Sequence, residues 1–324
     1  MIRFAKISFF CFLSILMITG IPYASDKGYP TQPITLIIPA APGGVMDLGA
    51  RFLVEDLSEY LGQPVIPTNK PGGGNYIGGN AVATAKPDGY TIGTLSVTAI
   101  MPEVFTYFRE APYTSADLKP ICRIMDYVGV VIVKADATWN SLEEVVEHAR
   151  KNPGMKFGVT AVGGWPDLVM KAIAQTKKVQ FVGLPEEGDS KVVMNILGGH
   201  IPVAIVAYAS AKAQLSAGAL KILAVGTPKR FELLPHVPTL AELGYVAPYD
   251  AHQGLFAPKD TPDSIIEKIN EAVKKVKEKG LYSQKLMSIG SPFIYESTDQ
   301  YRETLNRHKV QLKDYLTKFG YVKK

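Results

Sequence analysis

Residues 34–47 read ITLIIPAAPGGVMD, a segment with the features of a buried strand, a tight loop and the first turn of a helix. Five consecutive aliphatic or β-branched residues are typical of a strand that is covered on both faces. The following PAAPGG supplies a proline to end the strand and glycines for a tight loop. Apolar residues then recur at near-helical spacing from Met46 to Leu61, just before Gly62. The segment therefore predicts a strand–loop–helix unit.

The same alternation continues along the chain. Further strands are expected near residues 65–66, 90–95, 127–133, 157–160, 180–182, 203–206 and 220–225, and helices near 77–85, 141–152, 263–279 and 297–319. Over residues 252–258 the chain is expected to return to the first lobe. Ser141 with Glu144, and Ser297 with Gln300, have the spacing of capping boxes at two of the helix starts. Strands that alternate with helices indicate α/β units built on mainly parallel sheets with helices on both faces.

The length of 324 residues suits two lobes of about 100–200 residues each. We expect residues 26–128 to form the first part of lobe 1, residues 129–251 to form lobe 2, and residues 252–324 to return to lobe 1 with the C-terminal helices. The chain contains no long linker, low-complexity tract or fixed-period repeat. Two such lobes leave a cleft between them, which is a common place for a ligand.

The N-terminus has the parts of a secretory signal peptide. Arg3 and Lys6 precede an apolar run of about 15 residues, which is shorter than the roughly 20 needed to span a bilayer, and small residues follow at Ala24 and Ser25. We predict a cleavable signal peptide over residues 1–25; the alternative is a membrane anchor. Its removal leaves Cys122 as the only cysteine, so no internal disulfide can form. These features favour a bacterial periplasm.

Composition excludes several classes of protein. Hydrophobic residues make up 47% and charged residues 20%, which rules out collagen-like, coiled-coil and disordered chains. The net charge is +5, but Lys and Arg are scattered rather than clustered with aromatic residues, so we expect no nucleic-acid partner. No His, Cys, Asp or Glu spacing is typical of a metal site, and we expect no cofactor.

Two glycine-bearing loops are candidates for binding an anion. In PAAPGG the glycines allow close approach to the backbone, and the helix that follows begins with unpaired N–H groups and a partial positive charge. Residues 160–167, TAVGGWPD, repeat this arrangement in the second lobe. Facing each other across a cleft, the two helix starts would hold a carboxylate without an arginine. The alternative is two tight turns in which glycine serves geometry alone and Asp47 caps its helix.

Catalytic constellations are scarce. The chain has no Gly-x-Ser-x-Gly elbow and no His-Glu-x-x-His motif. Asp250 and His252 are spaced for an acid–base pair, although a role in the cleft wall or a hinge is favoured. The glycine-rich stretch at residues 70–79 is not a phosphate loop, because its lysine precedes the glycines. A lone buried Cys122 is expected to be inert.

Several segments together resemble one family. These are residues 29–34 (YPTQPI), 38–44 (IPAAPGG), 61–65 (LGQPV), 71–74 (PGGG), 86–91 (KPDGYT), 238–244 (PTLAELG) and 254–258 (GLFAP). In this order and spacing they resemble the Bug family, the substrate-binding proteins of tripartite tricarboxylate transporters. The likeness spans essentially the whole chain after the predicted signal peptide.

The resemblance implies a fold and a function. The fold would be a two-lobed periplasmic binding protein of type II, with a ligand in the cleft between the lobes. The protein would be a monomer that captures a small organic mono- or dicarboxylate and delivers it to the membrane permease subunits of a tripartite tricarboxylate transporter. Two alternatives stay open: a ligand-sensing partner of a membrane sensor kinase, and an exported hydrolase that uses the same cleft.

The resemblance also implies binding residues, which hold the carboxylate through backbone groups and water. They are Ala41, Gly43, Gly44 and Asp47 in the first loop, Thr160, Val162 and Gly163 in the second, and Ser96 after the third strand.

The chain also departs from the family pattern. Asn195, Pro202 and Val206 stand where acids often occur, and His252 replaces the usual tryptophan, so His252 joins the expected site. Loss of those acids argues against a ligand with an ammonium group, which would lack a counter-charge. Tyr208 and Trp165 are expected at an apolar end of the pocket, the alternative being ordinary packing.

Overall fold

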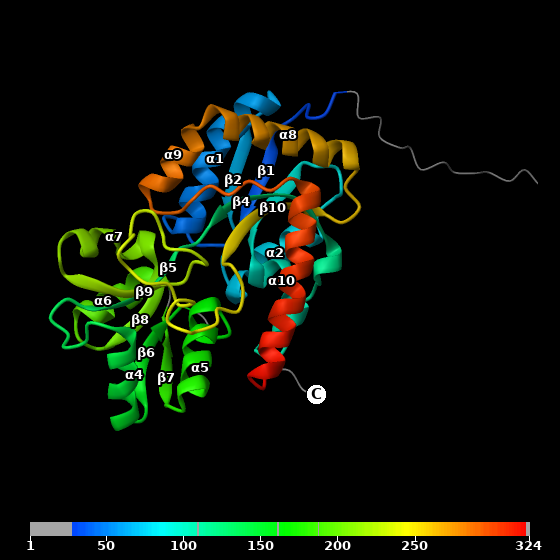
Figure 1. Ribbon diagram of the computed structural model, residues 1–324. Helices are drawn as coiled ribbons and strands as arrows, with labels where there is room; N and C mark the ends of the chain where they lie inside the picture. Colours follow the sequence, from blue (N-terminus) through cyan, green and yellow to red (C-terminus); the bar gives the residue numbers. More distant parts are fainter. Residues whose placement is uncertain (1–27, 109, 161, 187, 322–324) are drawn as a thin grey trace, which may run out of the picture.

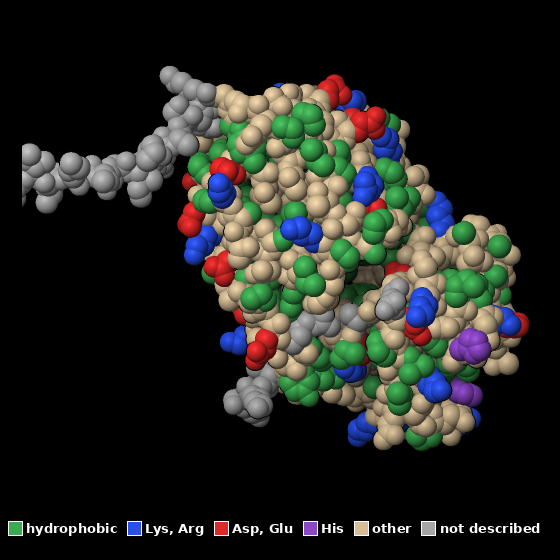
Figure 2. Space-filling model, turned by 180° about the vertical axis from the view of Figure 1, so that it is seen from behind, with side chains coloured by type: hydrophobic (Ala, Val, Ile, Leu, Met, Phe, Trp, Pro, Cys, Tyr) green, Lys and Arg blue, Asp and Glu red, His purple; other side chains and the backbone are tan. Residues whose placement is uncertain are grey.

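The structure, a computed structural model, describes residues 28–108, 110–160, 162–186 and 188–321 and shows two α/β lobes side by side (Figure 1). The predicted signal peptide lies outside the described residues. No helix in the part of the chain that the structure describes is long and apolar enough to span a membrane. On the face shown in Figure 2, positive and negative side chains are interspersed, and the surface is hollowed between the lobes.

The first sheet has the strand order β2-β1-β3-β10-β4. Its strands are β1 (Ile34–Ile38), β2 (Val65–Asn69), β3 (Thr91–Ser96), β4 (Leu118–Asp126) and β10 (His252–Pro258). Strand β1 pairs in parallel with β2 and β3, whereas β10 runs antiparallel between β3 and β4. The continuous apolar run of β1 is explained by burial on both faces, because Leu36 packs into one core cluster and Ile37 into another.

Helices cover both faces of this sheet. Helices α1 (Val45–Leu61), α8 (Asp263–Lys279) and α9 (Leu281–Ser288) pack on one face, and α2 (Tyr76–Ala83) with the first turns of α10 (Thr298–Lys318) pack on the other. Shorter elements join them: η1 (Gly73–Asn75), α3 (Val97–Ile100), η2 (Pro102–Phe105) and η3 (Ser115–Asp117). The expected capping box of Ser297 and Gln300 is present at the start of α10.

The second sheet repeats the plan of the first, with the order β7-β6-β8-β5-β9. Its strands are β5 (Gly129–Lys134), β6 (Met155–Val159), β7 (Phe181–Pro185), β8 (Val203–Ala207) and β9 (Leu220–Val225). Helices α4 (Leu142–Lys151) and α5 (Trp165–Lys177) cover one face, and α6 (Asp189–Leu197) and α7 (Tyr208–Ser216) cover the other. Ser141 accepts the Glu144 N–H at 3.2 Å, but the Glu144 carboxylate bonds Asn140 rather than completing a capping box.

The two-lobed α/β class is confirmed, and both sheets prove to be mixed. Three parallel strands in each sheet are followed by two antiparallel contacts, made by β10 in the first and β5 in the second. Strand–helix alternation does not show this, because β10 enters the first sheet from a distant part of the chain. Strand β4 was not predicted from the sequence.

Helix α10 reaches from one lobe to the other (Figure 1). Its first turns pack on the first sheet through Tyr301 and Leu305. Its last turns pack on α5 of the second lobe, where the Tyr315 hydroxyl donates to the Leu168 carbonyl at 2.9 Å and Gln175 donates to the Phe319 carbonyl at 2.9 Å. Helix α10 therefore contacts both lobes.

Candidate functional site

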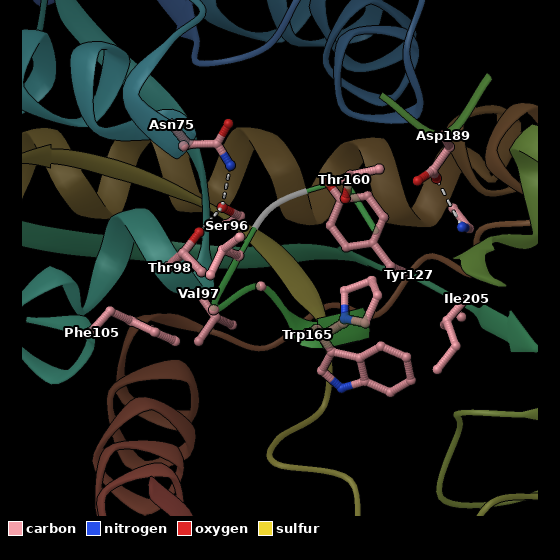
Figure 3. A pocket seen from close by; sticks show the side chains of 18 of the residues that line it. Asn75, Ser96, Val97, Thr98, Phe105, Tyr127, Thr160, Trp165, Asp189 and Ile205 are labelled. Atoms are coloured by element: carbon pink, nitrogen blue, oxygen red, sulfur yellow. Dashed lines mark hydrogen bonds between the residues drawn. The ribbon is translucent and has the colours of Figure 1, made fainter. Parts of the chain in front are cut away.

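A cavity of about 350 Å³ lies between the lobes. Its wall comes from the start of α2 and the β3–α3 junction in the first lobe, and from the β6–α5 loop, the start of α6 and the end of β8 in the second (Figure 3). Six of the predicted residues line it: Ser96, Thr160, Val162, Gly163, Trp165 and His252. No Lys or Arg is among the lining residues in the described ranges; Arg109, which follows Phe108 in the chain, lies outside those ranges.

The second-lobe wall is built by the loop that starts α5. Gly163 has φ 77°, and its N–H donates to the Asp167 carboxylate at 2.7 Å. The N–H groups of Gly164 and Trp165 have no acceptor among the described residues, and both residues line the cavity. The positive end of the α5 dipole therefore faces the cavity with donors that no described residue occupies. This arrangement suits an anion.

The first-lobe wall presents neutral polar side chains. Asn75 Nδ2 donates to Ser96 Oγ at 3.0 Å, and Ser96 Oγ lies 3.1 Å from Thr98 Oγ1 (Figure 3). Gly74, with φ 63°, allows the sharp turn that places Asn75 there. Ser96 was expected, whereas Asn75 and Thr98 were not. The glycine-rich stretch before Asn75 is the available signal in the sequence, although it matches no phosphate-loop pattern.

The first predicted loop lies outside the cavity. Ala41, Gly43 and Gly44 are exposed, and none of them lines the cavity. Asp47 is buried and does not line it either. The assignment of these four residues to the ligand stays a prediction.

Asp47 is instead occupied within its own lobe. Its carboxylate accepts the Gly43 N–H at 2.8 Å, Arg51 Nε at 2.9 Å and Asn69 Nδ2 at 2.8 Å. Burial alone would raise the pKa of Asp47, but these hydrogen bonds outweigh it and hold the pKa below the usual value. The capping interpretation of Asp47 therefore accounts for its contacts.

The two loops share one device. In each lobe an aspartate accepts the N–H of the glycine four residues before it and the charge of the base four residues after it: Gly43, Asp47 and Arg51 in one, Gly163, Asp167 and Lys171 in the other. Both aspartates are 2% exposed. The carboxylates therefore fix the shape of the glycine loops instead of binding a ligand directly.

Of the two aromatic residues expected in the pocket, one is there. Trp165 lines the cavity, and its Nε1 donates to the Tyr249 carbonyl at 2.8 Å. Tyr208 does not line the cavity, since its ring packs in a core of the second lobe against Phe231 and close to Gly290. Packing, the alternative interpretation, is what the structure shows for Tyr208.

His252 lies in the cavity wall, but it forms no acid–base pair with the Asp250 carboxylate. Its Nδ1 is 2.8 Å from the Asp250 backbone carbonyl, while the Asp250 carboxylate lies 3.7 Å from His308 Nε2. Burial, with Arg123 and His308 nearby, lowers the pKa of His252 well below its usual value. His252 is therefore a neutral wall residue at pH 7.

One acid in the cavity was missed. Asp189, in the first turn of α6, lines the cavity, and its Oδ2 accepts the Ala207 N–H at 2.8 Å and the Ser210 hydroxyl at 3.2 Å. Burial raises the pKa of this carboxyl. The second lobe therefore does place an acid in the cavity wall, at a position that the sequence analysis did not consider. An aspartate in a first helical turn looks like ordinary capping, which hides such a residue in a sequence.

Comparisons with known proteins agree on the family. The model of the tripartite tricarboxylate transporter family receptor matches residues 49–320. A Cupriavidus necator protein named "UPF0065 protein in gbd 5'region" is 30% identical over 300 residues, which cover 92% of this chain and 90% of that protein.

Solved structures extend the likeness to the fold. The R. palustris protein Rpa4515, solved with adipate, is 26% identical with a TM-score of 0.81 over 90% of this chain and 98% of that one. The periplasmic binding protein BugD is 25% identical with a TM-score of 0.78 over 91% and 100%. This chain therefore belongs to the tripartite tricarboxylate transporter receptor family, whose members, the Bug proteins among them, are solute-binding receptors rather than enzymes.

Proposed function

We propose that this protein is a periplasmic receptor that captures a small organic carboxylate between its lobes and delivers it to the membrane subunits of a tripartite tricarboxylate transporter. One observation carries the proposal: the start of α5 presents to a cavity between the lobes N–H groups that have no acceptor among the described residues. The adipate bound by the related R. palustris protein supports a carboxylate as the ligand class.

The binding mode follows from the cavity wall. The carboxylate accepts hydrogen bonds from the N–H groups of Gly164 and Trp165, and the hydroxyls of Ser96 and Thr98 approach it from the other lobe. Closure of the lobes then brings the exposed loop at residues 41–44 to the same ligand. A ligand drives such closure only by binding the closed form better than the open one.

The proposed function also requires that the protein be exported to the periplasm. A cleaved signal peptide over residues 1–25 would place the mature receptor in the periplasm, where it would meet both the carboxylate and the permease. Sequencing the N-terminus of the protein isolated from the periplasm tests this part. A mature chain that begins near residue 26 supports it, and a chain that retains Arg3 and Lys6 contradicts it.

Thermal unfolding against a panel of organic acids tests the binding function. The protein is first unfolded, dialysed and refolded to remove any bound ligand. A ligand at 100 times its dissociation constant adds about 2.7 kcal/mol to the free energy of unfolding. For a protein of this size, each kcal/mol raises the midpoint by roughly 2–4 °C. We expect a rise of several degrees with carboxylates and none with neutral sugars. If no acid in the panel raised the unfolding midpoint above that of the ligand-free protein, the result would contradict the proposal.

A further inference from the structure

Only one of the two carboxylate oxygens of Asp189 is hydrogen-bonded to described residues. Oδ2 accepts hydrogen bonds from the Ala207 N–H and the Ser210 hydroxyl, whereas Oδ1 has no hydrogen-bond partner among these residues. Asp189 is only partly exposed, and it lines the cavity. Figure 3 shows it across the cavity from Asn75 and Ser96. One oxygen therefore anchors α6 to the start of α7, and the other is available to a ligand.

No cation in the described ranges neutralises Asp189. It takes part in none of the ion pairs between described residues, and the groups that act on its pKa are hydrogen-bond donors and burial, with no charged base among them. Tyr127, whose pKa the charge of Asp189 helps to raise, donates its hydroxyl to Gln253 Oε1 at 3.1 Å instead. An acid withdrawn from water without a counter-charge is costly, so a cationic group in the cavity would be strongly favoured there.

The rest of the cavity suits a cation as well. Trp165, Tyr127, Phe105 and Phe108 line it, and aromatic ring faces attract ammonium groups. The start of α5 provides the opposite charge preference, because its free N–H groups favour an anion. The described wall is therefore divided, with an anion-favouring end at α5 and a cation-favouring point at Asp189. A second carboxylate placed at Asp189 would meet a like charge.

We propose that the ligand is an amino carboxylate, a zwitterion whose carboxylate binds at the start of α5 and whose ammonium group donates to Asp189 Oδ1. The inference rests on the proposed function and narrows its ligand class. It reverses the expectation, drawn from the sequence, that a ligand with an ammonium group would find no counter-charge. It also assigns to Asp189 the selection between ligands with and without a positive charge.

Matched pairs of ligands test the inference in the stripped, mature protein. Calorimetric titrations compare L-aspartate with succinate, L-glutamate with glutarate, and L-leucine with 4-methylpentanoate, at pH 7.5. Within the pair that fits the cavity, we expect the amine-bearing member to bind at least tenfold more tightly. A salt bridge to an acid with no other counter-charge is the physical reason.

The variant Asp189→Asn isolates the charge. An asparagine keeps an amide oxygen for the Ala207 N–H, so the anchor of α6 survives while the negative charge is lost. We expect the amine-bearing ligand to lose at least tenfold in affinity and its amine-free partner to bind equally well or better. Asp136→Asn is the matched control, because Asp136 is an exposed acid of the same lobe, paired with Lys134 and remote from the cavity wall.

The outcomes separate the two proposals. If the amine-free members bind at least as tightly as their partners to the wild type, the amino-carboxylate inference is wrong and the carboxylate receptor stands. If affinity for a dicarboxylate instead rises as the pH falls, and Asp189→Asn abolishes that rise, a protonated Asp189 is donating to a second carboxylate and the inference is again wrong. If no carboxylate of either kind binds, both the amino-carboxylate inference and the proposed function are wrong. The wild-type comparison decides the matter even if the variant does not fold.

Discussion

Gly163 shows how a single residue controls the cavity wall. Its φ of 77° is a conformation that favours glycine, and an added Cβ would lie 2.4 Å from Cγ of Phe108. Gly163 also donates its N–H to Asp167, which orients the donors that follow. A side chain at this position must therefore move either the loop or the Phe108 ring.

We expect Gly163→Val to lower carboxylate affinity at least tenfold, because the loop shift displaces the N–H groups of Gly164 and Trp165. The protein should also lose roughly 1–3 kcal/mol of stability from backbone strain. Titration with the best carboxylate of the panel measures the first effect and urea unfolding the second. Gly154→Val is the control: its φ is 86°, nothing lies within 4 Å of its Cβ, and it does not line the cavity. Equal affinity in Gly163→Val and the control would remove this loop from the binding model.

Some residues of the cavity wall could be predicted from the sequence and others could not, for a physical reason. Thr160 and Gly163 follow the end of β6, and Ser96 is the last residue of β3, so each lies at the carboxyl end of a strand in its own sheet. Such strand ends commonly line a cleft, as they do here. Asp189 and Asn75 could not be recognised as cavity residues from the sequence, because each looks there like the ordinary start of a helix. Tyr208 fails for the opposite reason: an aromatic residue beside a strand end packs into a core as readily as into a pocket.

At the scale of elements, the first turns of α1 and α5 are each stabilised by an aspartate of that same turn. Each has a buried aspartate that binds a loop glycine behind it and a base one turn ahead. The acid in the first turn also interacts favourably with the helix dipole. The loop and the helix therefore behave as one unit, and damage to the aspartate reaches the glycines.

Asp167→Ala tests this unit. The change leaves the Gly163 N–H and the Lys171 ammonium without their acceptor, so we expect a loss of about 1–3 kcal/mol in the free energy of unfolding, together with weaker carboxylate binding. Chemical denaturation and titration measure the two effects. Asp299→Ala serves for comparison: Asp299 is a first-turn acid of α10 with a basic partner, Arg302, but it is exposed, so its removal should change stability by less than about 0.5 kcal/mol. If Asp167→Ala were as stable as the wild type, the result would contradict a stabilising role of Asp167 for the loop and the start of α5.

Strand and helix positions were largely predictable because burial sets the period of the apolar residues. Strand β1 and helix α8 have the bounds that the pattern indicated. Pairing partners were not predictable from the same pattern. A strand buried on both faces has the same composition whether its neighbours run parallel or antiparallel, so the direction of β10 relative to β3 and β4 needed the structure.

At the scale of the whole molecule, buried charges gather where the chain crosses between lobes. Arg123 donates to Asp126 at 2.8 Å and to Glu296 at 2.9 Å, and His252 lies beside His308 with ring centroids 5.2 Å apart. Burial raises the pKa of Asp126 to about 6 and lowers that of His252. Stability should consequently depend on pH through this region.

Burial of His252 in its neutral form makes the protein less stable in acid. Its pKa is lower in the folded protein than the usual value of 6.5, so the unfolded chain binds more protons near that pH. Its stabilising contribution is present above pH 6.5 and is lost, by up to about 1.4 kcal/mol per pH unit, as the pH falls towards the folded value. Asp126 acts in the opposite direction between its usual 3.8 and about 6.

Urea unfolding at pH 7.5 and 5.5 measures this dependence. We expect His252→Gln to lose less stability than the wild type between the two values, because Asp126 remains in both proteins and the difference reports His252. His236→Gln, which changes an exposed histidine, should follow the wild type. A His252→Gln variant as sensitive to acid as the wild type would show that Asp250, Arg123 and His308 tolerate the imidazolium.

The passage of α10 across both lobes ends in an aromatic cluster beside the cavity. Tyr321 lies 5.3 Å from the ring of Phe108 and 5.4 Å from that of Tyr107, and Phe108 is the residue that a Cβ on Gly163 would strike. Only the ring of Phe108 thus lies between the last described residue of the chain and the β6–α5 loop. A fluorescent side chain introduced at position 321 would sit where capture of a solute changes its surroundings, which makes the tail of this receptor a site for building an optical sensor.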